Sequence, residues 1–236
     1  MLLVTSPQGH ILVDAATEQA APSILANIRA LGFKPEDVRW SVTSHEHFDH
    51  VGGLAALARA TGAKVALSPA SAAVLASGKP DAADSQFSDL KDNPIAMVKA
   101  DRILTAGTII SAGPLRLRAS FTPGHTAGST SWTWQSCAGA RCRTISYIDS
   151  ISALAAAPYR FTDHPEVVAR FRRTFTAIAA RRCDILVTPH PSASDVFERM
   201  LGKAPLGPKD ACRRYANAGR KRLDALLAKE TAETRK

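Results

Sequence analysis

The sequence predicts a mixed α/β fold (α+β in some schemes), in a single domain over residues 1–236. Apolar runs of strand length occur in both halves of the chain, and each half also contains segments with the apolar spacing of helices. The length allows a sizeable core. The hydrophobic fraction of 45% and the charged fraction of 22% are ordinary for a soluble globular protein. No apolar run approaches the length of a membrane span.

The strands are predicted from apolar runs that are bounded by turn residues. The first two, Leu2–Thr5 and His10–Asp14, are expected to form a hairpin around Pro7-Gln8-Gly9. In chain order, the other predicted strands cover residues 38–43, 64–67, 108–110, 115–121, 129–135, 143–148 and 184–188.

The helices are predicted from one-sided apolar patterns and from capping residues. The segment 22–31 places its apolar side chains on one face and ends at Gly32. Ser68 followed by Pro69 is a typical helix start. The polar segment 77–93 predicts a loop with a short helix near the entrance to the site. The remaining helices are predicted over 54–60, 164–181, 195–201 and 210–229.

The most informative stretch is His45-Glu46-His47-Phe48-Asp49-His50, which follows a predicted strand. A strand end that turns sharply can aim three imidazoles and one carboxylate at one point. Imidazole nitrogens and carboxylate oxygens are ligands that zinc accepts. The alternative, a solvated polar turn, suits a lone histidine better than four potential ligands in this order.

Two more histidines share this context. His125 lies in the segment 122–129 and His190 in the segment 184–191, and each follows a strand-like run within a Pro/Gly turn. Taken singly, each would be an ordinary loop histidine. Five of the seven histidines therefore fall at strand ends. His10 and His164 lack this context and are expected on the surface.

These motifs together resemble the metallo-β-lactamase superfamily, and in particular the third subclass of its β-lactamases. The subclass resemblance depends on Ser150, where other β-lactamase subclasses carry a zinc-binding cysteine. The resemblance covers nearly the whole chain and implies an αββα sandwich. It is carried by HxHxDH within Ser44–Gly53, TPGHTxGS within Thr122–Trp132, Tyr147–Ser152 and Asp184–Pro191.

The resemblance implies two zinc ions per chain. Their ligands would be His45, His47 and His125 for the first ion, and Asp49, His50 and His190 for the second. It further implies that a metal-bound hydroxide opens the β-lactam ring of carbapenems, cephalosporins and penicillins. Asp49 would be the catalytic residue, because it orients the hydroxide as well as binding metal.

The resemblance also implies substrate contacts. Ser150 and Ser152 would bind the substrate carboxylate directly or through water. The alternative is that their hydroxyls cap a strand end. Gln86 and Phe87 are expected to line the entrance to the site.

Two further aspartates are predicted to support the ligands. Asp14, at the end of a predicted strand, matches a structural aspartate of the superfamily that helps to fix ligand orientation. Asp149 is interpreted in the same way. In other hydrolases of the superfamily, including lactonases and hydroxyacylglutathione hydrolases, an aspartate near this position bridges both metals instead.

The alternative function is therefore another di-zinc hydrolase that acts on a lactone, an ester or a glutathione thioester. Non-enzymatic alternatives are a zinc-binding pseudo-enzyme and a basic nucleic-acid-binding protein. The net charge is +9, with basic clusters at 170–173, 181–182 and 213–222, which solvated helix faces also explain. We expect a small β-lactam as substrate, a monomer, and neither a nucleic-acid partner nor a membrane span.

The four cysteines are an even set with three possible pairings, or four thiols in a reducing compartment. The resemblance implies disulfides Cys137–Cys142 and Cys183–Cys212, and a periplasmic or secreted location. The chain begins without a recognisable signal peptide. Family members also carry further strands before this point, so the N-terminus is expected to be truncated.

Overall fold

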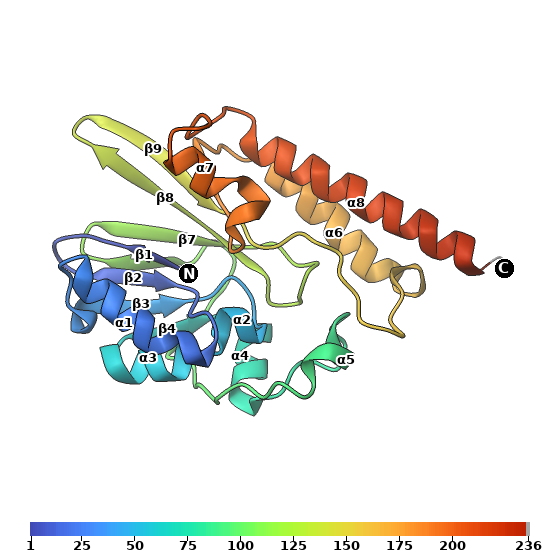
Figure 1. The fold of residues 1–236 in the computed structure, drawn as a ribbon, viewed down its shortest axis with the longest axis horizontal. Helices are drawn as coiled ribbons and strands as arrows, with labels where there is room; N and C mark the ends of the chain where they lie inside the picture. Colours follow the sequence, from blue (N-terminus) through green and yellow to red (C-terminus); the bar gives the residue numbers. More distant parts are fainter. Residues whose placement is uncertain (235–236) are drawn as a thin grey trace.

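The computed structural model of the protein describes residues 1–234 and contains two mixed sheets packed face to face (Figure 1). The first sheet has the strand order β1-β2-β3-β4-β5, and the second has the order β10-β9-β8-β7-β6. The strands are β1 (Leu2–Val4), β2 (His10–Val13), β3 (Val38–Val42), β4 (Lys64–Leu67), β5 (Arg102–Ile103), β6 (Ile109–Ala112), β7 (Leu115–Phe121), β8 (Thr130–Ala138), β9 (Arg141–Tyr147) and β10 (Ile185–Val187).

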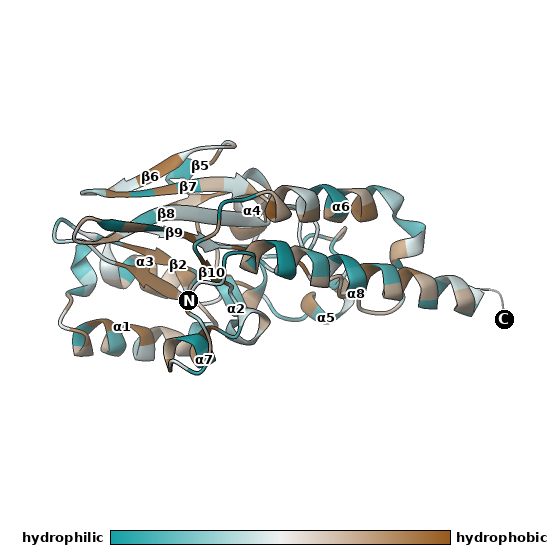
Figure 2. Ribbon diagram, turned by 90° about the horizontal axis from the view of Figure 1, so that it is seen from above, coloured by the Kyte–Doolittle hydropathy of each residue, from teal (hydrophilic) through white to brown (hydrophobic). Residues whose placement is uncertain are grey.

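Helices lie outside both sheets, so the layers form the expected αββα sandwich. Helices α1 and α3 lie beyond the first sheet, and the paired helices α6 and α8 lie beyond the second (Figures 1 and 2). Within residues 1–234, no helix has the length and apolar character needed to cross a membrane. The helices are α1 (Ala21–Ala30), α2 (Phe48–Val51), α3 (Leu54–Thr61), α4 (Pro69–Ser77), α5 (Phe87–Leu90), α6 (Pro165–Ala179), α7 (Val196–Met200) and α8 (Ala211–Thr234).

The apolar core follows these layers. In β2, Leu12 packs toward the helices, whereas Ile11 and Val13 pack between the sheets, so this central strand is buried on both faces. The fully buried Trp132 also lies between the sheets and donates its indole N–H to the Thr43 carbonyl over 3.0 Å. This bond ties β8 to the chain just before the histidine-rich motif.

Most predicted elements are confirmed within one or two residues. The first hairpin pairs β1 with β2, and Ser68 caps α4 by accepting the Ser71 N–H over 3.2 Å. Strands β8 and β9 run further than predicted and meet at Gly139-Ala140. Their polar ends lack an apolar pattern but are held in the sheet by pairing between the two strands. The two-residue strand β5 and the single turn α2 are too short to show a period in the sequence.

Both predicted disulfides are present. Cys137–Cys142 joins directly opposed residues of β8 and β9. Cys183–Cys212 connects the chain after α6 to the first turn of α8, which fastens the helical layer to the second sheet.

The surface prediction for His10 was wrong. His10 is only 4% exposed, and its ring packs edge-on against Phe33 with 4.7 Å between centroids. The prediction for His164 holds: its side chain is 41% exposed, and its ring stacks on Tyr159 with 4.2 Å between the centroids. Phe33 is far from His10 in the chain, so the local sequence gave no sign of that contact.

Candidate active site

The predicted site residues come from loops at one edge of the sandwich. Strands β2 and β3 are parallel, so Asp14 after β2 lies near the segment 45–50 after β3. In the second sheet, β9 and β10 are parallel, and they place Asp149 and His190 at neighbouring strand ends. His125 lies in the turn between β7 and β8. The loops thus bring together residues that are far apart in the sequence.

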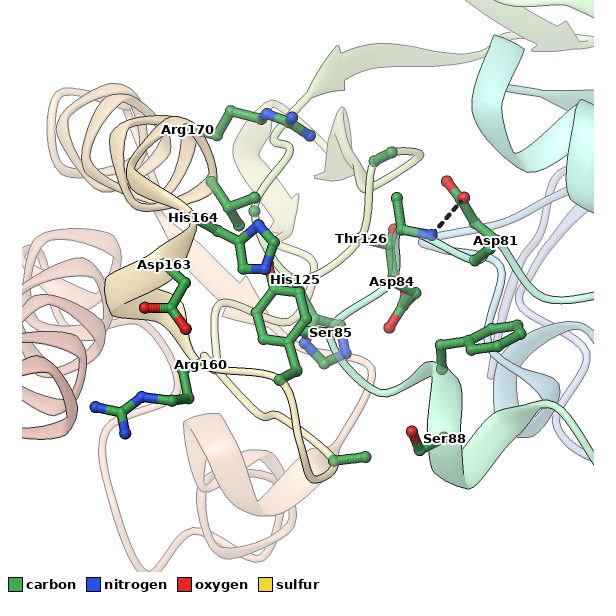
Figure 3. Close-up of a pocket in the computed structure, with 18 of the residues that line it drawn as sticks. Asp81, Asp84, Ser85, Ser88, His125, Thr126, Arg160, Asp163, His164 and Arg170 are labelled. Carbon is green, nitrogen blue, oxygen red and sulfur yellow. Dashed lines mark hydrogen bonds between the residues drawn. The ribbon is translucent and has the colours of Figure 1, made fainter. Parts of the chain in front are cut away.

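A cavity of about 480 Å³ opens beside His125 (Figure 3). Its walls come from the segment before and within α5 and from the segment that leads into α6. Phe87 lines it as predicted. Gln86, Ser150 and Ser152 are not among the described residues that line it.

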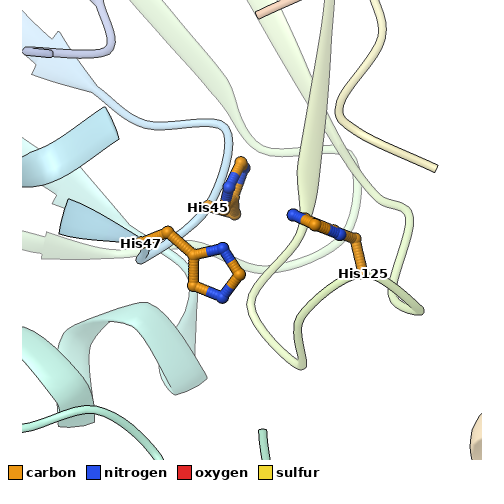
Figure 4. Close-up of side chains that lie close together, drawn as sticks. All are labelled: His45, His47 and His125. Carbon is orange, nitrogen blue, oxygen red and sulfur yellow. The ribbon is translucent and has the colours of Figure 1, made fainter. Parts of the chain in front are cut away.

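Three buried histidines face one another across the site (Figure 4). His45, His47 and His125 each offer a ligand atom within 4.8 Å of the others. One nitrogen of each ring is held by an oxygen that accepts a hydrogen bond, so the other nitrogen is left unprotonated for a metal. The pairs are His45 Nδ1 with Asp149 Oδ1 at 2.8 Å, His47 Nε2 with Asp84 Oδ2 at 3.0 Å, and His125 Nδ1 with the Ser152 carbonyl at 2.9 Å.

The remaining predicted ligands form a second group against the first. His50 Nε2 lies 3.3 Å from His190 Nε2 and 3.2 Å from Asp49 Oδ2. His190 Nε2 and the same Asp49 oxygen are 3.7 Å apart. The side chains of Asp49 and His190 are 38% and 55% exposed, so this group opens to solvent.

Burial and hydrogen bonding set the charge of these rings in the metal-free protein. Burial, and next the neighbouring His50, lowers the pKa of His45 well below its ordinary value. Burial and the nearby His47 lower the pKa of His125 to about 4. Burial alone would lower the pKa of His50, but its hydrogen bonds with Asp14 and Asp49 raise it to about 10. A metal ion that bound to His50 would therefore have to displace a proton.

Asp14 supports this arrangement from behind. Its buried carboxylate accepts the Ser44 N–H over 2.6 Å, the Ser44 hydroxyl over 2.9 Å, and the Tyr147 hydroxyl over 2.6 Å. The carboxylate also lies 3.3 Å from His50 Nδ1. Burial would raise the pKa of Asp14, but the hydrogen bonds with His50 and Tyr147 hold it below its usual range.

Glu46 and Asp84 have structural contacts that sequence reasoning missed. The buried Glu46 carboxylate accepts hydrogen bonds from two segments that follow it in the chain. Its donors are the Ser71 hydroxyl at 2.9 Å, the Thr126 hydroxyl at 3.0 Å and the Gly128 N–H at 3.0 Å. Glu46 thus fastens the loop of His125 to the loop of His45. The position of Glu46 inside the histidine motif could have suggested a structural role from the sequence, whereas no sequence feature singled out Asp84.

The comparisons with known proteins show the family of this chain. A family model described as "Metallo-beta-lactamase superfamily" matches residues 1–137, which is more than half of the chain. The chain belongs to the metallo-β-lactamase superfamily. Its fold follows from this membership: the protein has the metallo-β-lactamase fold.

Solved metallo-β-lactamases superimpose over almost the whole chain. MIM-1 from Novosphingobium pentaromativorans is 48% identical with a TM-score of 0.94, covering 98% of this chain and 84% of that one. MEM-A1, a subclass B3 metallo-β-lactamase from a soil metagenome library, is 40% identical with a TM-score of 0.90, covering 98% and 90%.

A curated relative of different activity matches a shorter part. It is a hydroxyacylglutathione hydrolase from Anaeromyxobacter dehalogenans (strain 2CP-C), 33% identical over 124 residues. That match covers 52% of this chain and only 37% of the relative. The chain therefore spans little more than a third of the length of this hydroxyacylglutathione hydrolase.

Proposed function

We propose that this protein hydrolyses the β-lactam ring of antibiotics and uses two zinc ions to do so. The observation that carries the proposal is the convergence of ring nitrogens in the first histidine group. Three imidazoles, each held on its outer side by an oxygen, present their other nitrogens to a common point. Such an arrangement suits a divalent ion.

The residues present fit zinc. The Nε2 atom of His45 is buried and has no hydrogen-bond partner among the described residues, which is costly unless a ligand takes it up. His45, His47 and His125 would hold the first ion, and Asp49, His50 and His190 the second. When bound, zinc ions lower the pKa of a water molecule and polarise a carbonyl group.

The chain's own groups then divide the remaining work. The partly exposed Asp49 carboxylate lies at the solvent side of the site, where it can orient the attacking water by accepting its hydrogen bond. The cavity beside His125 receives the substrate. Ser150, which follows β9 at the same edge, remains our candidate for binding the substrate carboxylate, together with Ser152.

The place of Asp149 supports the β-lactamase proposal over the alternative hydrolases. Its Oδ1 atom is 2.8 Å from His45 Nδ1, on the side of the ring away from the buried and unpartnered Nε2. Burial raises its pKa. An aspartate behind His45 fits a supporting role better than a bridge between two metals.

We also propose an oxidising compartment, periplasmic or extracellular, because both disulfides are formed and such bonds persist there.

A substrate panel tests the proposed function. We expect imipenem and nitrocefin to be turned over with kcat/KM at least about 100-fold above that for a lactone or a glutathione thioester. The same protein after zinc removal with a chelator is the control, and it should turn over none of them. A preference for the lactone or the thioester would show that the alternative hydrolase is the right one.

A further inference from the structure

Asp84 reaches into the site from a segment with no metal ligand of its own. It precedes α5, and its side chain is only 5% exposed. One carboxylate oxygen, Oδ2, lies 3.0 Å from His47 Nε2. The other, Oδ1, accepts the backbone N–H of Gln86 over 2.7 Å. One carboxylate therefore serves a histidine of the site and the turn that begins α5.

The chemistry of the first contact fixes the His47 ring. A carboxylate only accepts hydrogen bonds, so the proton of the neutral ring must sit on Nε2. This leaves Nδ1 without a proton, and Figure 4 shows a ring nitrogen of His47 directed toward His45 and His125. Asp84 thus selects the form of His47 that can bind a metal.

The second contact shapes the cavity. Asp84, Ser85 and Phe87 all line the cavity beside His125, and Figure 3 shows Asp84 and Ser85 there. The Ser85 hydroxyl makes a separate tether by donating to the Leu154 carbonyl over 2.6 Å. The wall is consequently held at two neighbouring points, and only the one at Asp84 also touches a site histidine.

We propose that Asp84 is a positioning residue that couples the cavity wall to the metal site. Through Oδ2 it orients His47, and through Oδ1 it holds the turn whose side chains meet the substrate. The part of this inference that concerns substrate binding rests on the proposed function. The part that concerns the orientation of His47 depends only on hydrogen bonds within the chain and not on the substrate.

Substitution by asparagine gives a sharp test, because the amide has nearly the same shape but only one acceptor oxygen. In Asp84→Asn, an NH₂ group must face either Gln86 N–H or His47 Nε2. In the first case the turn loosens. In the second case the His47 proton is driven to Nδ1, where the metal should bind. The amide therefore cannot preserve both functions, and Asp84→Ala preserves neither.

The experiment compares the wild-type chain with the variants Asp84→Asn, Asp84→Ala and Ser85→Ala. Zinc affinity is measured by chelator competition, and KM and kcat are measured with imipenem. Asp84→Ala is expected to weaken the affinity for one zinc ion by about 10- to 100-fold and also to raise KM. Ser85→Ala, the matched control, should raise KM while zinc affinity stays within about twofold. Asp84→Asn should show either a weakened zinc affinity or a raised KM, with the other value close to wild type.

Nitrogen NMR of the metal-free proteins reads the His47 ring directly. Wild type and Ser85→Ala should carry the proton on Nε2, and Asp84→Ala should show a mixture of both forms. The proposal is overturned if Asp84→Ala changes KM alone, as Ser85→Ala does, or if both Asp84 variants keep wild-type zinc affinity and KM. If wild type binds zinc but leaves β-lactams intact, the proposed function fails, while zinc affinity and NMR still decide the role of Asp84.

Discussion

Replacing Asp49 by alanine is expected to lower kcat/KM for imipenem by about 1,000-fold at saturating zinc. The side chain has two proposed tasks. Its Oδ2 atom faces both His50 and His190, where the second ion would bind, and its exposed position lets it orient the attacking water. Removing it takes away a metal ligand and the group that aligns the nucleophile.

Ser150→Ala is the matched control for a side-chain nucleophile. If water is the nucleophile, this variant should keep kcat within about tenfold of wild type and mainly raise KM. Steady-state kinetics on both variants, with mass spectrometry of the enzyme during turnover, measures the difference. An acyl group trapped on Ser150, or an Asp49→Ala variant with near wild-type kcat/KM, would contradict the proposed mechanism.

Replacing Asp14 by asparagine is expected to lower the free energy of unfolding by about 3 kcal/mol. Its φ of 62° is tolerated by asparagine, so the backbone is not the reason. The carboxylate accepts from Ser44 and Tyr147 and faces His50, all of them buried. An amide must turn an NH₂ group toward one of these donors and leaves His50 without its full counter-charge.

Urea unfolding of the metal-free protein measures this loss, with Tyr147→Phe as the control. The control removes one donor and leaves the carboxylate in place, so it should cost only about 1 kcal/mol. Equal unfolding free energies for Asp14→Asn and wild type would show that these contacts contribute little to the fold.

The elements with local signals were predictable from sequence. Ser68 and Pro69 marked the start of α4 because capping acts within one turn. The segment 45–50 could be recognised as a candidate metal site because its four potential ligands are neighbours in the chain. The positions of His125 and His190 beside this segment could be predicted because each follows a strand in a Pro/Gly turn, and such turns meet at one edge of the sandwich.

Contacts between residues that only the folded chain brings together could not be predicted from the sequence. Asp84 is one acidic residue in a polar loop, and its pairing with His47 spans 37 positions without any repeating pattern. The burial of His10 depends on Phe33, which reaches it only after α1 has folded back. Glu46 was visible inside the motif, but the direction of its side chain is set by Thr126 and Gly128 from the far sheet.

Metal content together with turnover tests the central claim most directly. Folded protein that has been saturated with zinc and then dialysed should contain about two zinc ions per chain and hydrolyse imipenem. Chelation should abolish that turnover, and added zinc should restore it. A zinc content near zero in protein shown to be folded by circular dichroism, or imipenem turnover that survives complete removal of the metal, would contradict a zinc-dependent β-lactam hydrolase.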